Sequence, residues 1–175
     1  MIENKKKDLL KGLALMRAIS WKDNYIVLLD NIKITLFPCR AWAVTLENLK
    51  KKSNEEYVYN LGYLYGVEAF KVIKKRVTTL KFNIADNYLE FPSILEVSGI
   101  GKVDYMEGKS NIKKISFLEH EAIKESIRLF GENASAITFY AGAVSAFHNL
   151  YFNKDEKFRG VVEGGTYYFI KDGNN

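Results

Sequence analysis

The chain contains two histidines, His120 and His148, and a single cysteine, Cys39. A histidine acts as a general base or a metal ligand when an orienting partner or further ligands stand beside it. The sequence offers no Ser-His-Asp or Cys-His arrangement around either histidine, and the zinc-binding helix motifs need a second histidine. One cysteine forms no intrachain disulfide and builds no multi-cysteine zinc site. We therefore predict no catalytic residue and no metal site, and we favour a protein that is not an enzyme.

His148 lies near the end of a segment without charged residues, which runs from Asn133 to Asn153. Its bulky side chains are spaced three and four residues apart, and this spacing predicts a buried helix. They are Ile137, Tyr140, Val144, Phe147 and Tyr151. A second stripe is small or polar and consists of Ala134, Thr138, Ala141, Gly142, Ser145 and Asn149. The polar residues of this segment argue against a membrane-spanning helix.

A second helix is predicted from Asn54 to about Arg76, and it carries Gly62 and Gly66 on one face. A glycine inside a helix costs about 1 kcal/mol relative to alanine, so a close approach of another backbone or of a flat ligand should offset it. We predict that this face and the small stripe leave room for an apolar or aromatic small molecule. Its predicted binding residues are Gly62, Tyr65, Gly66, Tyr140, Gly142 and His148. Two alternatives stay open: the two faces pack only on each other, and His148 is a hydrogen-bonded structural residue.

The remaining elements alternate between helical and strand-like periods. An amphipathic basic helix is expected within residues 1–20, and one further domain over residues 21–175. Two-residue hairpin turns are expected at Asp30-Asn31 and at Gly164-Gly165. The other predicted helices are Arg40–Lys52, a short one near Phe91 and Glu119–Phe130, and the other predicted strands lie in GKVDYMEG and IKKISFL. Together they predict an α+β fold, an antiparallel sheet packed with several helices.

Net charge and the start of the chain restrict its partners only loosely. The 175 residues carry a net charge of +5, which permits an anionic partner without requiring one. Lys5, Lys6, Lys7 and Lys11 give the N-terminal helix a basic face. No basic patch is interleaved with aromatic residues, so nucleic-acid binding has little support. No secretory signal pattern follows the first lysines, and a cytoplasmic location is expected.

The order of four motifs resembles the 4-vinyl-reductase-like domain, which is related to a subunit fold of the TRAPP vesicle-tethering complex. The motifs are NLGYLYGVEAF, SGIGKVDY, TFYAGAVSAFHNLYF and FRGVVEGGTYYFI, and the resemblance covers about Trp21 to the end. It implies an α+β module, often dimeric, that senses or carries small molecules such as aromatic effectors, tetrapyrrole precursors or acyl chains. By position it matches Gly62, Gly66, Gly99, Gly101, Tyr140, Gly142, His148 and Glu163.

The chain departs from this family in one respect. Many members carry metal-holding cysteines on and after the late helix, whereas this chain has none there. The resemblance therefore implies a domain without the family's metal site that binds or senses a hydrophobic or aromatic ligand without catalysing a reaction. The alternative is a homodimeric regulatory or interaction protein that binds a protein partner or DNA through its basic surface.

Overall fold

The computed structural model describes residues 19–22, 25–28, 32–34, 38–79, 91–108, 111–118, 120–164 and 166–173. The chain divides into two compact units, Met1–Phe37 and Pro38–Asn175. The predicted boundary between residues 20 and 21 stays a prediction. The basic N-terminal helix, with its four lysines, was predicted on residues that lie almost entirely outside the described ranges. Among the described helices, none has the length and the apolar character that crossing a bilayer requires.

The first unit contains a three-stranded antiparallel sheet in the order β1-β2-β3. Its strands are β1 (Ile19–Lys22), β2 (Tyr25–Leu28) and β3 (Ile32–Ile34). The predicted pairing of β2 with β3 is confirmed. The expectation that residues 1–20 end in a helix is wrong at Ile19 and Ser20, because these residues pair with Leu28 and Val27 of β2.

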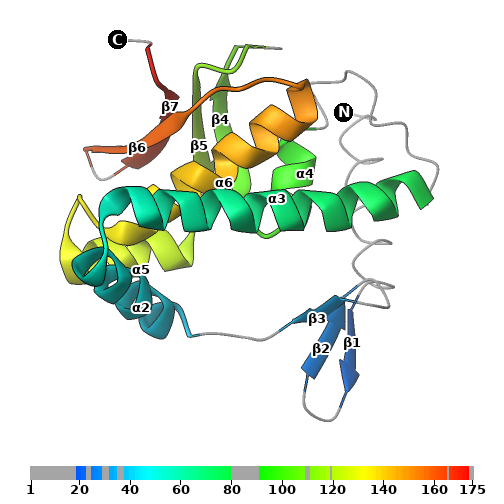
Figure 1. Cartoon of the computed structure of the whole chain (residues 1–175), viewed down its shortest axis with the longest axis horizontal. Helices are drawn as coiled ribbons and strands as arrows, with labels where there is room; N and C mark the ends of the chain where they lie inside the picture. The colour runs from blue at the N-terminus through cyan, green and yellow to red at the C-terminus, as the bar shows by residue number, and fades with distance from the viewer. Residues whose placement is uncertain are drawn as a thin grey trace. The chain divides into compact units, whose positions relative to one another are not determined.

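The second unit holds a four-stranded antiparallel sheet and five helices (Figure 1). The helices are α2 (Cys39–Lys52), α3 (Glu55–Thr79), α4 (Phe91–Val97), α5 (Glu121–Phe130) and α6 (Ser135–Phe152). The strands are β4 (Lys102–Glu107), β5 (Lys114–Leu118), β6 (Phe158–Glu163) and β7 (Thr166–Lys171), in the order β4-β5-β7-β6. The predicted α+β class is confirmed. The hairpin at Gly164 is confirmed too, because Glu163 pairs with Thr166 and Gly164 has a positive φ of 57°.

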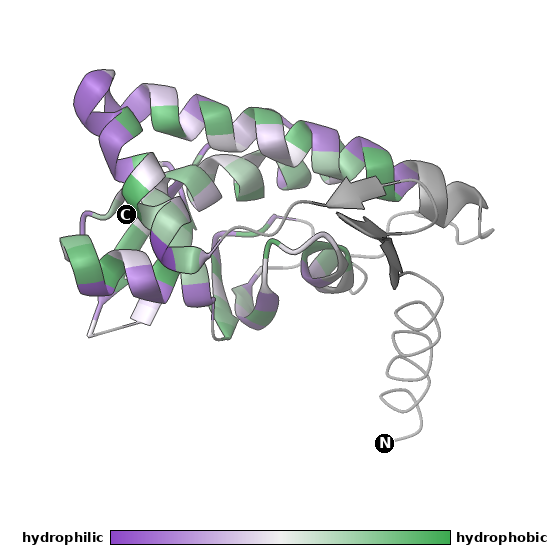
Figure 2. Cartoon of the chain, turned by 90° about the horizontal axis from the view of Figure 1, so that it is seen from below, coloured by the Kyte–Doolittle hydropathy of each residue, from purple (hydrophilic) through white to green (hydrophobic). Residues whose placement is uncertain are grey.

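Helix α6 is the middle layer of this unit. It contacts β6 and β7 of the sheet, and it contacts α3, which lies on its other side (Figure 1). Every residue from Ser135 to Asn149 except Thr138 is buried. The prediction of a central helix packed on both sides is therefore confirmed. Helix α3 covers it with one face only, and hydrophobic and hydrophilic residues alternate along its length (Figure 2).

The first backbone N–H groups of a helix have no partner inside the helix, and the N-cap residue of α6, Ala134, has no side-chain acceptor for them. Glu47 of α2 supplies this cap. Its carboxylate accepts a hydrogen bond of 2.7 Å from the Ser135 hydroxyl and one of 3.4 Å from the Ser135 N–H. Glu55 of α3 accepts a further bond of 2.8 Å from the Thr138 hydroxyl. The negative charges of these carboxylates also stabilise α6, because they lie near the positive N-terminal end of its helix dipole.

Candidate functional site

The three predicted glycines lie where α3 and α6 approach most closely. A side chain on Gly62 would meet the backbone of Phe139, and one on Gly66 would meet the backbone of Ala143. A side chain on Gly142 would in turn meet the backbone of Tyr59. Each glycine therefore faces the other helix at backbone distance. This packing accounts for the helix-interior glycines, and it fills the space beside them, so a ligand would contact other residues of the predicted set.

Tyr65 and Tyr140 belong to a cluster of rings around the first half of α6. Phe139 is at its centre, with ring centroids 5.2 Å from Trp42, 5.5 Å from Tyr65 and 5.2 Å from Tyr140. The Trp42 indole donates a hydrogen bond to the Tyr140 phenol. Edge-to-face rings at these separations stabilise one another beyond their buried area. The structure thus brings together the two predicted tyrosines, from α3 and α6, in what we call the aromatic cluster.

His120 also belongs to the aromatic cluster, although it was not among the predicted binding residues. It precedes α5, and its ring centroid lies 4.1 Å from that of Tyr140. Its backbone N–H donates a 2.9 Å hydrogen bond to the Tyr167 hydroxyl of β7, which holds the residue beside the sheet. His120 stands between Glu119 and Glu121, and a charged context of this kind is typical of a solvated helix face. Its one distinguishing signal is its place two residues after the mainly apolar strand ISFL.

Burial keeps the His120 ring neutral at physiological pH. It lowers the pKa of His120 to about 4, although the backbone carbonyl groups of His120 itself and of Ile100, and the charge of Glu121, act in the opposite direction. The ring atom Nδ1 is buried and has no hydrogen-bond partner among the described residues. A neutral imidazole carries one nitrogen that accepts a hydrogen bond. The aromatic cluster therefore contains a buried polar atom without a hydrogen-bond partner among the described residues.

The phenol groups of the aromatic cluster also stay uncharged. Burial raises the pKa of Tyr140, and the nearby Tyr65 phenol adds to this effect. Burial raises the pKa of Tyr65 as well, although 43% of this residue is exposed. The cluster is thus apolar and neutral, reaches solvent at Tyr65, and presents hydroxyl, indole and imidazole groups. Such a composition suits an uncharged aromatic molecule.

His148 does not belong to the aromatic cluster. It lies two helical turns beyond Tyr140, about 12 Å along α6, with a side chain that is fully buried. Its ring packs among those of Phe91, Phe152 and Phe158, with centroids 6.2, 5.0 and 5.1 Å away. Burial lowers the pKa of His148, although Asn149 and Glu156 favour its charged form.

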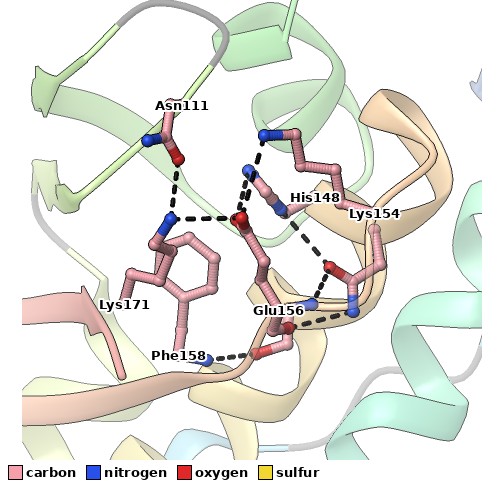
Figure 3. A network of polar contacts seen from close by, with 8 residues as sticks. Asn111, His148, Lys154, Glu156, Phe158 and Lys171 are labelled. Carbon is pink, nitrogen blue, oxygen red and sulfur yellow. Dashed lines mark hydrogen bonds and ion pairs between the residues drawn. The ribbon is translucent and has the colours of Figure 1, made fainter. Parts of the chain in front are cut away.

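A polar network surrounds His148 at the end of α6 (Figure 3). His148 Nε2 lies 3.6 Å from Glu156 Oε2, and Glu156 Oε1 accepts a hydrogen bond of 3.1 Å from Lys171 Nζ of β7. Lys171 Nζ also donates to Asn111 Oδ1 at 2.7 Å. The Asn149 side chain donates to the Glu156 carbonyl oxygen and accepts from the Glu156 N–H, each at 2.9 Å. This network ties the turn after α6 to the sheet.

The described residues contain no group of three or more His, Cys, Asp or Glu side chains that could hold a metal ion. Cys39 is exposed at the start of α2. Within the described ranges, the aromatic cluster is where the predicted ligand-binding tyrosines and an unpartnered buried nitrogen occur together. The polar network is the other candidate, because His148 Nε2 and Glu156 Oε2 are likewise buried without a hydrogen-bond partner, but these two atoms lie 3.6 Å from each other.

Neither the models of known protein families nor curated protein sequences match this chain. Among solved structures, the chain is similar to the phenol-responsive sensory domain of the transcription activator PoxR with phenol. The TM-score is 0.66 at 13% sequence identity, and the alignment covers 94% of this chain and 88% of that one. At this identity the likeness establishes the fold alone: an α+β architecture with a four-stranded antiparallel sheet packed against helices.

Proposed function

We propose that this chain is a sensory or carrier domain that binds a small, neutral aromatic molecule at the aromatic cluster without transforming it. The observation that carries the proposal is the buried, unpartnered Nδ1 of His120 beside the Tyr140 ring. A buried polar atom without a partner costs about 1–3 kcal/mol. A ligand hydroxyl that donates to this nitrogen would offset that cost, while the rings of Trp42 and Phe139 would pack against the ligand.

The similar fold of the PoxR sensory domain, whose structure contains phenol, supports this ligand class. A phenol combines an apolar ring with one hydrogen-bond donor, which matches the chemistry of the aromatic cluster. Of the six residues predicted to bind the ligand, Tyr65 and Tyr140 keep that role in the proposal. His120 takes the place that His148 held in the prediction. The relation to TRAPP subunits and a cytoplasmic location stay predictions.

Calorimetric titration with phenol, and with benzene as a probe that lacks the hydroxyl, tests this proposal. We expect phenol to bind measurably and benzene to bind about five- to thirteenfold more weakly, since a lost hydrogen bond of about 1–1.5 kcal/mol corresponds to that factor. His120→Phe should weaken phenol binding by a similar factor. His148→Gln is the matched control, because it changes the other histidine, and it should leave binding within twofold. Equal binding of the two probes would contradict the role of His120.

The alternative function, a regulatory protein that binds DNA or a protein partner, depends on the basic N-terminal residues, which the structure does not describe. It predicts an affinity for duplex DNA that falls steeply with salt and disappears when Lys5, Lys6, Lys7 and Lys11 are changed to glutamine. Sensing and regulation are compatible, since a ligand-binding domain can control such an activity. Phenol binding that is unchanged by these substitutions would separate the two functions.

A further inference from the structure

The two edges of the four-stranded sheet differ in the regularity of their pairing. Along β4, the register with β5 shifts between Val103 and Tyr105. A bulge of this kind disfavours the addition of another strand at that edge. The opposite edge, β6, pairs with β7 in an unbroken register from Phe158 to Glu163.

The free backbone groups of β6 belong to alternate residues. In a hairpin with a two-residue loop, the closing pair exchanges hydrogen bonds, so Glu163, Val161 and Arg159 bond to β7. Gly160 and Val162 then direct their N–H and C=O groups toward the open edge. Phe158 alternates in step with Gly160 and Val162, so its N–H also points away from β7. It donates a hydrogen bond of 2.9 Å to Ser145 Oγ.

The side chains of β6 also alternate between the two faces of the sheet. A side chain on Gly160 would meet Ile137 of α6, so the even-numbered residues face the helix. Arg159, Val161 and Glu163 therefore lie on the opposite face. The Arg159 and Glu163 side chains are 54% and 59% exposed. They stand two residues before and two residues after Val161, with opposite charges.

We propose that β6 is the interface with a second copy of this chain, in which the two β6 strands pair antiparallel about a two-fold axis at Val161. Arg159 then lies directly opposite Glu163 of the second copy, and Glu163 opposite its Arg159. Gly160 and Val162 exchange backbone hydrogen bonds with Val162 and Gly160 of the second copy, which satisfies the open edge. The two sheets join into one continuous antiparallel sheet.

The order of charges favours a second copy over an unrelated strand. An interface with two-fold symmetry must be self-complementary, because the same patch meets itself. The opposite charges of Arg159 and Glu163, equally spaced about one residue, meet this requirement. Within the chain, Arg159 lies 3.8 Å from Asp172 and Glu163 lies 3.7 Å from Lys114. Exposed pairs at such distances contribute little, so they do not prevent pairing between copies.

Sedimentation equilibrium of the full chain, with Arg159→Glu and Glu163→Arg as single variants, tests the interface. Each single variant places like charges opposite each other twice, and the dimer dissociation constant should rise about tenfold or more. An equimolar mixture of the two variants should form a heterodimer with the wild-type constant, because both facing pairs are again of opposite charge. The double variant, with both charges exchanged, should also regain the wild-type constant.

Lys102→Glu and Glu107→Lys on β4 are matched controls on the other edge, and they should leave the constant unchanged. Val161→Lys places two cations together at the axis and should weaken the dimer independently of the charge pairs. Circular dichroism establishes that each variant is folded. A wild-type chain that stays monomeric at high micromolar concentration would overturn the proposal, as would a mixture of the single variants that fails to associate. Phenol binding by the β6 variants should match wild type, which separates this interface from the ligand site.

Discussion

The two histidines lie at opposite ends of the buried segment of α6, and their surroundings differ. His120 meets Tyr140 in the aromatic cluster, where the neighbouring side chains are neutral and its Nδ1 has no partner among the described residues. His148 lies in the polar network, with Glu156 facing its Nε2 and Asn149 near its Nδ1. Burial lowers the pKa of both. At both ends a buried ring nitrogen has no hydrogen-bond partner among the described residues, but Nε2 of His148 has a carboxylate oxygen 3.6 Å away.

This difference separates a candidate binding group from a structural one. The His148 ring is fully buried among phenylalanine rings and has a carboxylate near its Nε2, whereas His120 is partly exposed and lies among neutral aromatic rings. An unsatisfied buried nitrogen gains from a ligand only where the ligand can reach it, so His148 is the weaker ligand candidate. Four predictions test it, and they follow in order of decreasing expected effect.

The first prediction concerns the contact between α3 and α6, the helix that carries residues of both the aromatic cluster and the polar network. Gly142→Leu would drive a side chain into the backbone of Tyr59, and overpacking of this kind costs about 3 kcal/mol or more. We expect the free energy of unfolding, measured in urea, to fall by that amount and both the aromatic cluster and the polar network to be lost together. Leu64→Ala, at a position on α3 that is 62% exposed, is the control and should change stability by less than about 0.5 kcal/mol. A stable Gly142→Leu variant would show that the helices can move apart.

The second prediction removes each histidine in turn. His148→Ala leaves a cavity among three phenylalanine rings and leaves Glu156 Oε2 without its facing group, so we expect a loss of about 2–3 kcal/mol. His120→Ala removes a less buried ring without a side-chain hydrogen bond and should cost about 1 kcal/mol. Urea unfolding of both variants measures the difference. A larger cost for His120 would reverse the assignment of structural and binding roles.

The third prediction is a dependence of stability on pH. Both folded-state pKa values lie below the ordinary histidine value of 6.5, so the unfolded chain binds more protons as the pH falls. The contribution of these groups is fully present above pH 6.5 and decreases below it, and the His120 part continues to decrease until about pH 4. We expect a combined loss of about 1–3 kcal/mol between pH 7 and pH 4.5. Chemical unfolding at several pH values measures it, and His120→Gln combined with His148→Gln should remove most of the slope.

The fourth and smallest effect concerns the Ser145 hydroxyl, which lies on α6 between Tyr140 and His148. Ser145 Oγ accepts bonds from the Tyr59 hydroxyl at 2.7 Å and from the Phe158 N–H at 2.9 Å, and it donates to the Ala141 carbonyl. Tyr59→Phe removes the first bond and should cost about 1 kcal/mol. Tyr57→Phe, at a residue that is 51% exposed, is the control. If both substitutions lower the melting temperature equally, the Tyr59 bond contributes nothing specific.

Most secondary structure followed from local patterns. The three-and-four spacing of bulky residues in α6, the glycines of α3 and the Gly164-Gly165 turn each predicted an element that the structure contains. The short helix predicted near Phe91 is present as α4. Strand β1 was not predicted, because the helix expected within residues 1–20 included Ile19 and Ser20. Element boundaries depend on hydrogen bonds to distant residues, and these are not visible in a local pattern.

The sequence by itself determined that the segment from Asn133 to Asn153 is a buried helix and that its glycine-bearing neighbour packs closely. Only the tertiary structure decided that His120, rather than His148, stands beside Tyr140. The physical reason is that periodicity reports which face of an element is buried, but not which element buries it. The pairing of β5 with β7 and the bond from His120 to Tyr167 join residues about fifty positions apart, and these contacts place the imidazole.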